Sequence, residues 1–164
     1  MAATSSSNAL SIGRPRAFEA IVYGGLVAGV LDFLAASINA YLRGTSPVRV
    51  WQYVASGLLG PASFSRGYGS VLLGVLCHFV IAFGAAIVFF FASLRFPILI
   101  QQAVIFGIVY GVVVYFFMSR VVVPLSAART FPFSFQGLIT GLIIHIVCVG
   151  LPIALLTRRA RRVK

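Results

Sequence analysis

Four apolar stretches, each of about 20 residues or more, constrain this chain more than any other feature. They span residues 20–42, 68–94, 98–123 and 135–157, with ends uncertain by a few residues. A helix needs about 20 apolar residues to cross the ~30 Å hydrocarbon core of a bilayer, whereas a barrel strand needs about ten alternating residues. The sequence therefore predicts an all-α integral membrane four-helix bundle with up-down topology.

The composition agrees with a membrane environment and argues against a nucleic-acid partner. Hydrophobic residues make up 60% of the chain, against about 45–50% in soluble domains. The net charge is +11, but the bases cluster at the ends of apolar stretches, as in the C-terminal RRARRVK. No basic face carries interleaved stacking aromatics. We therefore expect the basic termini to meet anionic lipid headgroups, and we expect no nucleic acid.

The flanks of the apolar region predict the domain boundaries and the topology. We expect a flexible N-terminal tail over 1–18, a four-helix transmembrane domain over 19–157 and a basic C-terminal tail over 158–164. Eight basic residues fall on the side of the termini and five on the opposite side. This bias predicts a multi-pass protein of the bacterial inner membrane with both termini cytoplasmic.

The longest loop, SPVRVWQYVASGLLGP, predicts a short helix. Thr45 or Ser46 is placed to cap it, with Pro47 in its first turn. One side of this helix gathers the apolar residues Val50, Trp51, Val54, Ala55, Leu58 and Leu59. We expect an interfacial helix on the outer membrane face, with Trp51 at headgroup level.

Regularly spaced glycines predict close contacts between the spans. The expected helix-packing residues are Gly25, Gly29, Gly74, Gly107, Gly111 and Gly141. Small residues four apart let helix backbones approach closely in a membrane. Gly74 and Gly141 each precede a histidine by four residues, and PASF at 61–64 resembles PFSF at 132–135. The pattern is compatible with a duplicated helical hairpin.

Polar residues inside the spans predict a polar layer in the membrane. Its expected members are Asp32, Asn39, His78, Tyr115 and His145. Asp32 and both histidines fall about ten residues from the outer boundary, which corresponds to a depth of about 15 Å. An aspartate at the centre of a membrane helix costs about 2.5–3.5 kcal/mol on insertion scales, so it needs a partner. The layer fits interhelical hydrogen bonding, a proton or small-solute site, or haem ligation.

The haem alternative depends on His78 and His145, the only histidines of the chain. In an up-down bundle the second and fourth helices are parallel and diagonally opposed. This arrangement resembles transmembrane cytochromes b and implies a haem b-binding electron-transfer subunit with His78 and His145 as axial ligands. Those proteins usually carry two such pairs. We therefore expect no cofactor and no metal site, and we expect one histidine to meet Asp32 instead.

The sequence motifs indicate a non-enzymatic role. There is no P-loop, no GxSxG and no HExxH. The tracts YVASGLLGPASF (53–64), VVPLS (122–126) and GLPIAL (150–155) resemble those of small bacterial four-helix inner-membrane proteins, a likeness that implies no activity. We expect an accessory subunit of a membrane assembly, as a homo-oligomer or in a larger complex, or a small-solute or proton-handling bundle.

Overall fold

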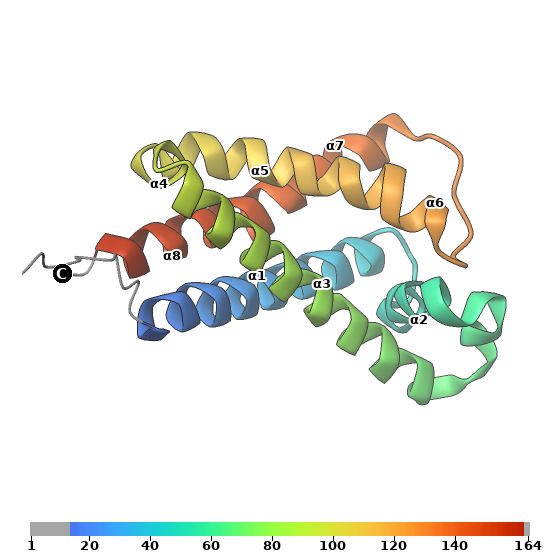
Figure 1. Cartoon of the computed structure of the whole chain (residues 1–164). Coiled ribbons are helices and arrows are strands. Elements are labelled where there is room, and N and C mark those ends of the chain that lie inside the picture. The colour runs from blue at the N-terminus through green and yellow to red at the C-terminus, as the bar shows by residue number, and fades with distance from the viewer. Residues whose placement is uncertain (1–13, 163–164) are drawn as a thin grey trace, which may run out of the picture.

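The computed structural model describes residues 14–162, which contain helices and no strand (Figure 1). Four long helical segments run alternately up and down. The first is α1 (Arg14–Leu42) and the second is α3 (Gly67–Arg95). The third comprises α5 (Ala103–Phe117), the π-helical η2 (Met118–Val122) and α6 (Val123–Leu125). The fourth comprises α7 (Phe135–Ile144), the π-helical η3 (His145–Gly150) and α8 (Leu151–Arg162).

All four segments are long and apolar enough to cross a membrane, which is typical of a multi-pass membrane protein. The predicted all-α four-helix fold is therefore confirmed for the described residues. The start of α1, the end of α8 and the turn at 95–98 lie at one end, which we call the termini end (Figure 1). The short helix α2 (Pro47–Leu59) lies at the opposite end, which we call the α2 end.

The order of the helices around the bundle determines which side chains meet. The first segment packs against α3 on one side and against η3 and α8 on the other, while α5 packs against η3 and α8. An apolar core at the termini half joins all four segments through residues such as Ala28, Phe89, Ala103 and Ile153. Toward the α2 end, α3 diverges from the third segment (Figure 1).

Each π-helical segment ends two residues before a proline, Pro124 after η2 and Pro152 after η3. Proline has no backbone N–H, and its ring crowds the carbonyl four residues earlier. Before each proline the backbone hydrogen bonds join residues five positions apart, as in a π-helix. This spacing avoids the α-helical backbone hydrogen bond at the carbonyl that the proline ring crowds. The shift in the fourth segment begins at His145.

The boundaries of the spans and of the two tails differ from the sequence prediction in three places. The third span begins at Ala103, because a four-residue helix, α4 (Ile98–Gln101), precedes it and ends at the non-helical Gln102. The expected basic tail over 158–164 is helical as far as Arg162. The first helix begins at Arg14, inside the tail expected over 1–18, and residues 1–13 and 163–164 lie outside the described part.

The C-terminal arginines continue the helix because one of them has a partner. Arg161 donates hydrogen bonds to the carbonyl oxygen and to Oγ of Ser93 on α3. Thr157 and Ala160, on the same side of α8, are buried. The basic segment is therefore part of the bundle at the termini end.

The predicted short helix α2 is present, with Ser46 at its N-cap and Pro47 in its first turn. Its inward face shares Trp51 and Ala55 with the expected apolar side but also contains Gln52 and Ser56. Trp51 is only 4% exposed, so its ring packs inside the bundle. Leu58, expected on the apolar face, is 68% exposed.

A glycine on α3 explains why α2 packs so closely. A Cβ at Gly74 would collide with the backbone carbonyl of Trp51, so only glycine permits this approach. The polar groups on the inward face find acceptors within reach. The Gln52 amide donates to the Gly67 carbonyl at 3.4 Å, and the Ser56 hydroxyl donates to the Tyr53 carbonyl at 2.6 Å.

The other five predicted packing glycines also lie against other parts of the chain. Gly25 and Gly29 meet the rings of Phe83 and Phe79, and Gly141 meets the ring of Tyr115. Gly107 and Gly111 meet the backbone of the fourth segment near Leu151 and Ile146. These glycines therefore contribute to contacts within one chain.

Candidate functional site

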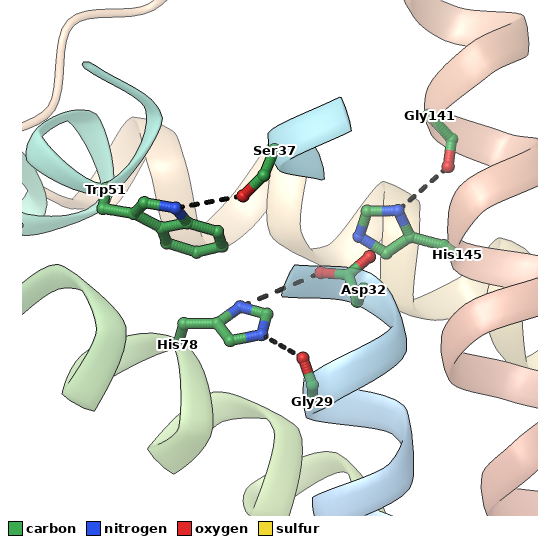
Figure 2. Close-up of polar contacts among 7 residues, drawn as sticks. All are labelled: Gly29, Asp32, Ser37, Trp51, His78, Gly141 and His145. Carbon is green, nitrogen blue, oxygen red and sulfur yellow. Dashed lines mark hydrogen bonds and ion pairs between the residues drawn. The ribbon is translucent and has the colours of Figure 1, made fainter. Parts of the chain in front are cut away.

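The most unusual polar contact in the bundle joins Asp32 of α1 to His78 of α3 (Figure 2). Asp32 Oδ2 lies 3.8 Å from His78 Nδ1, and the two side chains are only 16% and 12% exposed. Both residues lie about ten positions from the α2 end of their helices, about 15 Å along the axis. This depth corresponds to the middle of a hydrocarbon core of about 30 Å.

The hydrogen bond of His78 Nε2 determines whether Nδ1 carries a proton when the ring is neutral. His78 Nε2 lies 2.9 Å from the Gly29 carbonyl oxygen. A carbonyl only accepts, so Nε2 carries a proton and donates it. The Nδ1 lone pair of a neutral ring then faces a carboxylate oxygen. The contact becomes attractive when one proton resides on Nδ1 or on the Asp32 carboxyl.

The other oxygen of Asp32 has no partner in the described part of the chain. Oδ1 is buried and accepts no hydrogen bond. An unsatisfied buried acceptor costs about 1–3 kcal/mol, and more when it is charged. Such an oxygen normally binds a proton, accepts a hydrogen bond from a water molecule or contacts a cation.

The Trp51 side chain of α2 lies beside His78 of the pair (Figure 2). The Trp51 ring stacks on Phe33 with a centroid distance of 4.3 Å and an interplanar angle of 12°. Its centroid is 5.2 Å from that of His78, in an edge-on arrangement. Trp51 Nε1 also donates to Ser37 Oγ at 3.2 Å. Through Trp51, helix α2 thus contacts α1 by one stacking interaction and one hydrogen bond and reaches the His78 ring.

His145 lies beyond Asp32 in the view of Figure 2, so that the carboxylate appears between the two imidazoles. Its Nδ1 donates to the Gly141 carbonyl at 2.9 Å, one turn earlier in the same segment. The Tyr115 ring lies edge-on to it, with centroids 5.4 Å apart. This leaves Nε2 of His145 available for another partner.

Asn39 lies apart from the other predicted members of the polar layer. It is about two turns beyond Asp32 toward the α2 end, and its Oδ1 accepts a hydrogen bond from Arg43 Nε at 3.1 Å. The structure instead adds Phe33, Ser37 and Trp51 to the surroundings of the pair. The sequence drew attention to Trp51 as the single tryptophan of the chain, but it did not predict that this side chain points toward His78.

The geometry around His78 does not fit haem ligation. Two axial imidazole nitrogens would need to lie about 4 Å apart across a flat cavity, each about 2 Å from the iron. His78 Nε2 donates to the Gly29 carbonyl, and Nδ1 faces Asp32. Neither nitrogen of His78 is open to an iron in this arrangement.

The contact between Asp32 and His78 can link α1 to α3, and it can exchange a proton between a carboxyl group and an imidazole. Among the described residues, no three His, Cys, Asp or Glu side chains are grouped as a metal site. Compared with protein-family models, curated proteins and solved structures, the chain matches none of them significantly.

Proposed function

We propose that this chain is a non-enzymatic, proton-handling membrane bundle in which Asp32 and His78 exchange a proton near the middle of the bilayer. The observation that carries the proposal is the buried contact of 3.8 Å between Asp32 Oδ2 and His78 Nδ1. The Gly29 carbonyl holds the imidazole with Nδ1 toward the carboxyl group. Intramembrane ionisable residues commonly mark ion or proton pathways.

The surroundings favour access from the α2 end only. On that side the pair is covered by Trp51, which belongs to a short helix and is stacked on Phe33. On the other side Ala28, one turn before Asp32, begins the apolar core that continues through Phe89 and Ile153. A proton reaches the pair when α2 moves, whereas the core blocks passage to the termini end. The expected behaviour is proton uptake and release, with slow flux across the membrane.

Infrared titration tests the proposal directly, because the chain has only two acidic side chains. We expect a protonated-carboxyl band that changes with pH, that is absent in Asp32→Asn and that persists in Glu19→Gln. Glu19 is the matched control, since it is an exposed carboxylate near the termini end. If Asp32→Asn leaves the titrating bands unchanged, Asp32 does not exchange protons and the proposal fails.

The two histidines provide a second matched pair. His78→Gln retains an N–H that can donate to the Gly29 carbonyl but removes the titrating nitrogen. We expect this change to shift the pH dependence of the Asp32 band. His145→Gln is expected to have a smaller effect, because His145 donates to its own helix. Equal effects would contradict the assignment of His78 as the partner.

Topology and cellular context are part of the proposal. The excess of basic residues on the side of the termini supports a cytoplasmic termini end in a bacterial inner membrane. Reporter fusions at both chain ends test this orientation. Purification from native membranes tests whether the bundle also serves as an accessory subunit, and a Soret band lost in His78→Ala would favour the haem alternative over proton exchange.

A further inference from the structure

A cavity of ≈ 620 Å³ at the α2 end brings together two arginines from different helices. Arg43 directly follows α1, and Arg120 lies in η2 of the third segment. We call this space the arginine cavity. Its polar lining also includes Tyr53, Tyr115, Ser119 and Thr130.

No carboxylate balances the two charges of the arginine cavity. The chain contains only Glu19 and Asp32 as acidic residues. Glu19 lines a different cavity, formed with Arg159 on α8, and Asp32 faces His78 in the middle of the bundle. The missing negative charge must come from outside the protein, as solvent ions or as an anionic ligand.

The two guanidinium groups are positioned differently. Arg43 is held by neutral acceptors, because Nε donates to Asn39 Oδ1 at 3.1 Å and Nη2 donates to Thr140 Oγ1 at 3.2 Å. Arg120 lies within a segment long and apolar enough to span a membrane. A cation at such a position is costly and normally faces a polar space or a partner. Among the described residues no acceptor is hydrogen-bonded to Arg120, so its guanidinium donors remain available.

An apolar groove of ≈ 560 Å³ adjoins the arginine cavity. The two spaces share Tyr53 and Val123 in their linings. The groove follows the outward side of α3, where Leu76 and Val80 are 56% and 71% exposed, toward η2. This is the region where α3 diverges from the third segment (Figure 1).

We infer that the arginine cavity and this groove together bind one anionic phospholipid. The phosphodiester group lies between Arg43 and Arg120, and one acyl chain lies in the groove between α3 and η2. Guanidinium groups recognise phosphate through paired, charge-assisted hydrogen bonds. The combination of an unbalanced cationic cavity and a continuous apolar groove matches an amphiphile. A free phosphate ion would use only the first part. This inference is independent of the proposed proton exchange.

Native mass spectrometry of the full, delipidated chain in detergent tests the inference. Phosphatidylglycerol and phosphatidylcholine with identical acyl chains serve as the anionic and zwitterionic probes. Both lipids carry the phosphodiester, but the choline ammonium of phosphatidylcholine is repelled by the two guanidinium groups. We therefore expect phosphatidylglycerol to bind about tenfold more tightly. Arg120→Gln and Arg43→Gln should each remove most of this preference. Arg66→Gln, an equal charge change at an exposed position of the same end, should leave it intact.

The acyl-chain part has its own matched pair on α3. Val80→Trp fills the groove and should weaken the binding of both lipids at least severalfold. Val88→Trp, at another exposed position of the same helix, should leave their binding unchanged. The inference is overturned if Arg66→Gln acts like Arg120→Gln, because the preference would then reflect net charge alone. It is also overturned if inorganic phosphate displaces the lipid at equal concentration, or if Val80→Trp leaves lipid binding unchanged. Thermal unfolding of each variant verifies that the bundle remains folded.

Discussion

Gly74→Ala is the substitution that most directly tests how α2 covers the Asp32–His78 pair. A methyl group at this position would collide with the backbone carbonyl of Trp51 and would approach the Ala55 nitrogen to 3.2 Å. These obstructing atoms belong to a helix backbone, so they cannot move away as a flexible side chain would. The helix α2 must shift outward, or α3 must bend.

The expected cost follows from two opposing terms. Overpacking a tight contact costs about 1–3 kcal/mol. Alanine is better than glycine inside a helix by about 1 kcal/mol, which offsets part of that cost. Because the clash is with backbone, the upper half of the overpacking range applies. We expect a net loss of about 1–2 kcal/mol in the free energy of unfolding.

The intrinsic fluorescence of Trp51 is a specific assay, because it is the only tryptophan in the chain. In the native fold it is 4% exposed. We expect Gly74→Ala to shift its emission to longer wavelength and to increase quenching by acrylamide. Unfolding by SDS in mixed micelles measures the accompanying loss of stability.

Gly84→Ala on the same helix is the matched control, since a Cβ there meets nothing within 4 Å. It should leave Trp51 fluorescence unchanged and raise stability slightly. If Gly74→Ala keeps native stability and native quenching, α2 does not pack on α3 as described. If Gly84→Ala is equally destabilising, the effect belongs to glycine in this helix and not to the contact with α2.

Three further changes test other contacts. Gly150→Ala should destabilise the bundle by about 1–3 kcal/mol in SDS unfolding, because its methyl group would meet the α5 backbone, whereas Gly69→Ala meets open space and should be tolerated. Arg161→Gln should lower the free energy of unfolding by about 1–3 kcal/mol through loss of its bonds to α3, and the exposed Arg159→Gln should have little effect. Burial raises the pKa of Tyr53 above its ordinary value near 10. The folded state then keeps a proton that the unfolded state loses, so stability should fall as pH rises above about 10, and Tyr53→Phe should reduce this fall in pH-dependent unfolding.

The sequence was sufficient for features that depend on distance along the chain. About 20 consecutive apolar residues predict a span wherever they occur, and the helical rise converts residue number into depth. Asp32, His78 and His145 could therefore be assigned a common depth before their neighbours were known. Pro47 with Ser46 likewise predicted the start of α2, because capping is a local property.

Lateral neighbours depended on the tertiary structure, because they are determined by contacts between residues far apart in sequence. The sequence left four candidate partners for Asp32, namely Asn39, His78, Tyr115 and His145. The packing of α1 against α3 brings His78 to it. The inward face of α2 was predicted only in part, at Trp51 and Ala55. Polarity within the helix did not indicate Gln52 and Ser56, which are buried where α2 approaches α3 closely at Gly74. Arg43 and Arg120 are 77 positions apart and share a cavity only because the ends of α1 and the third segment lie together in the fold.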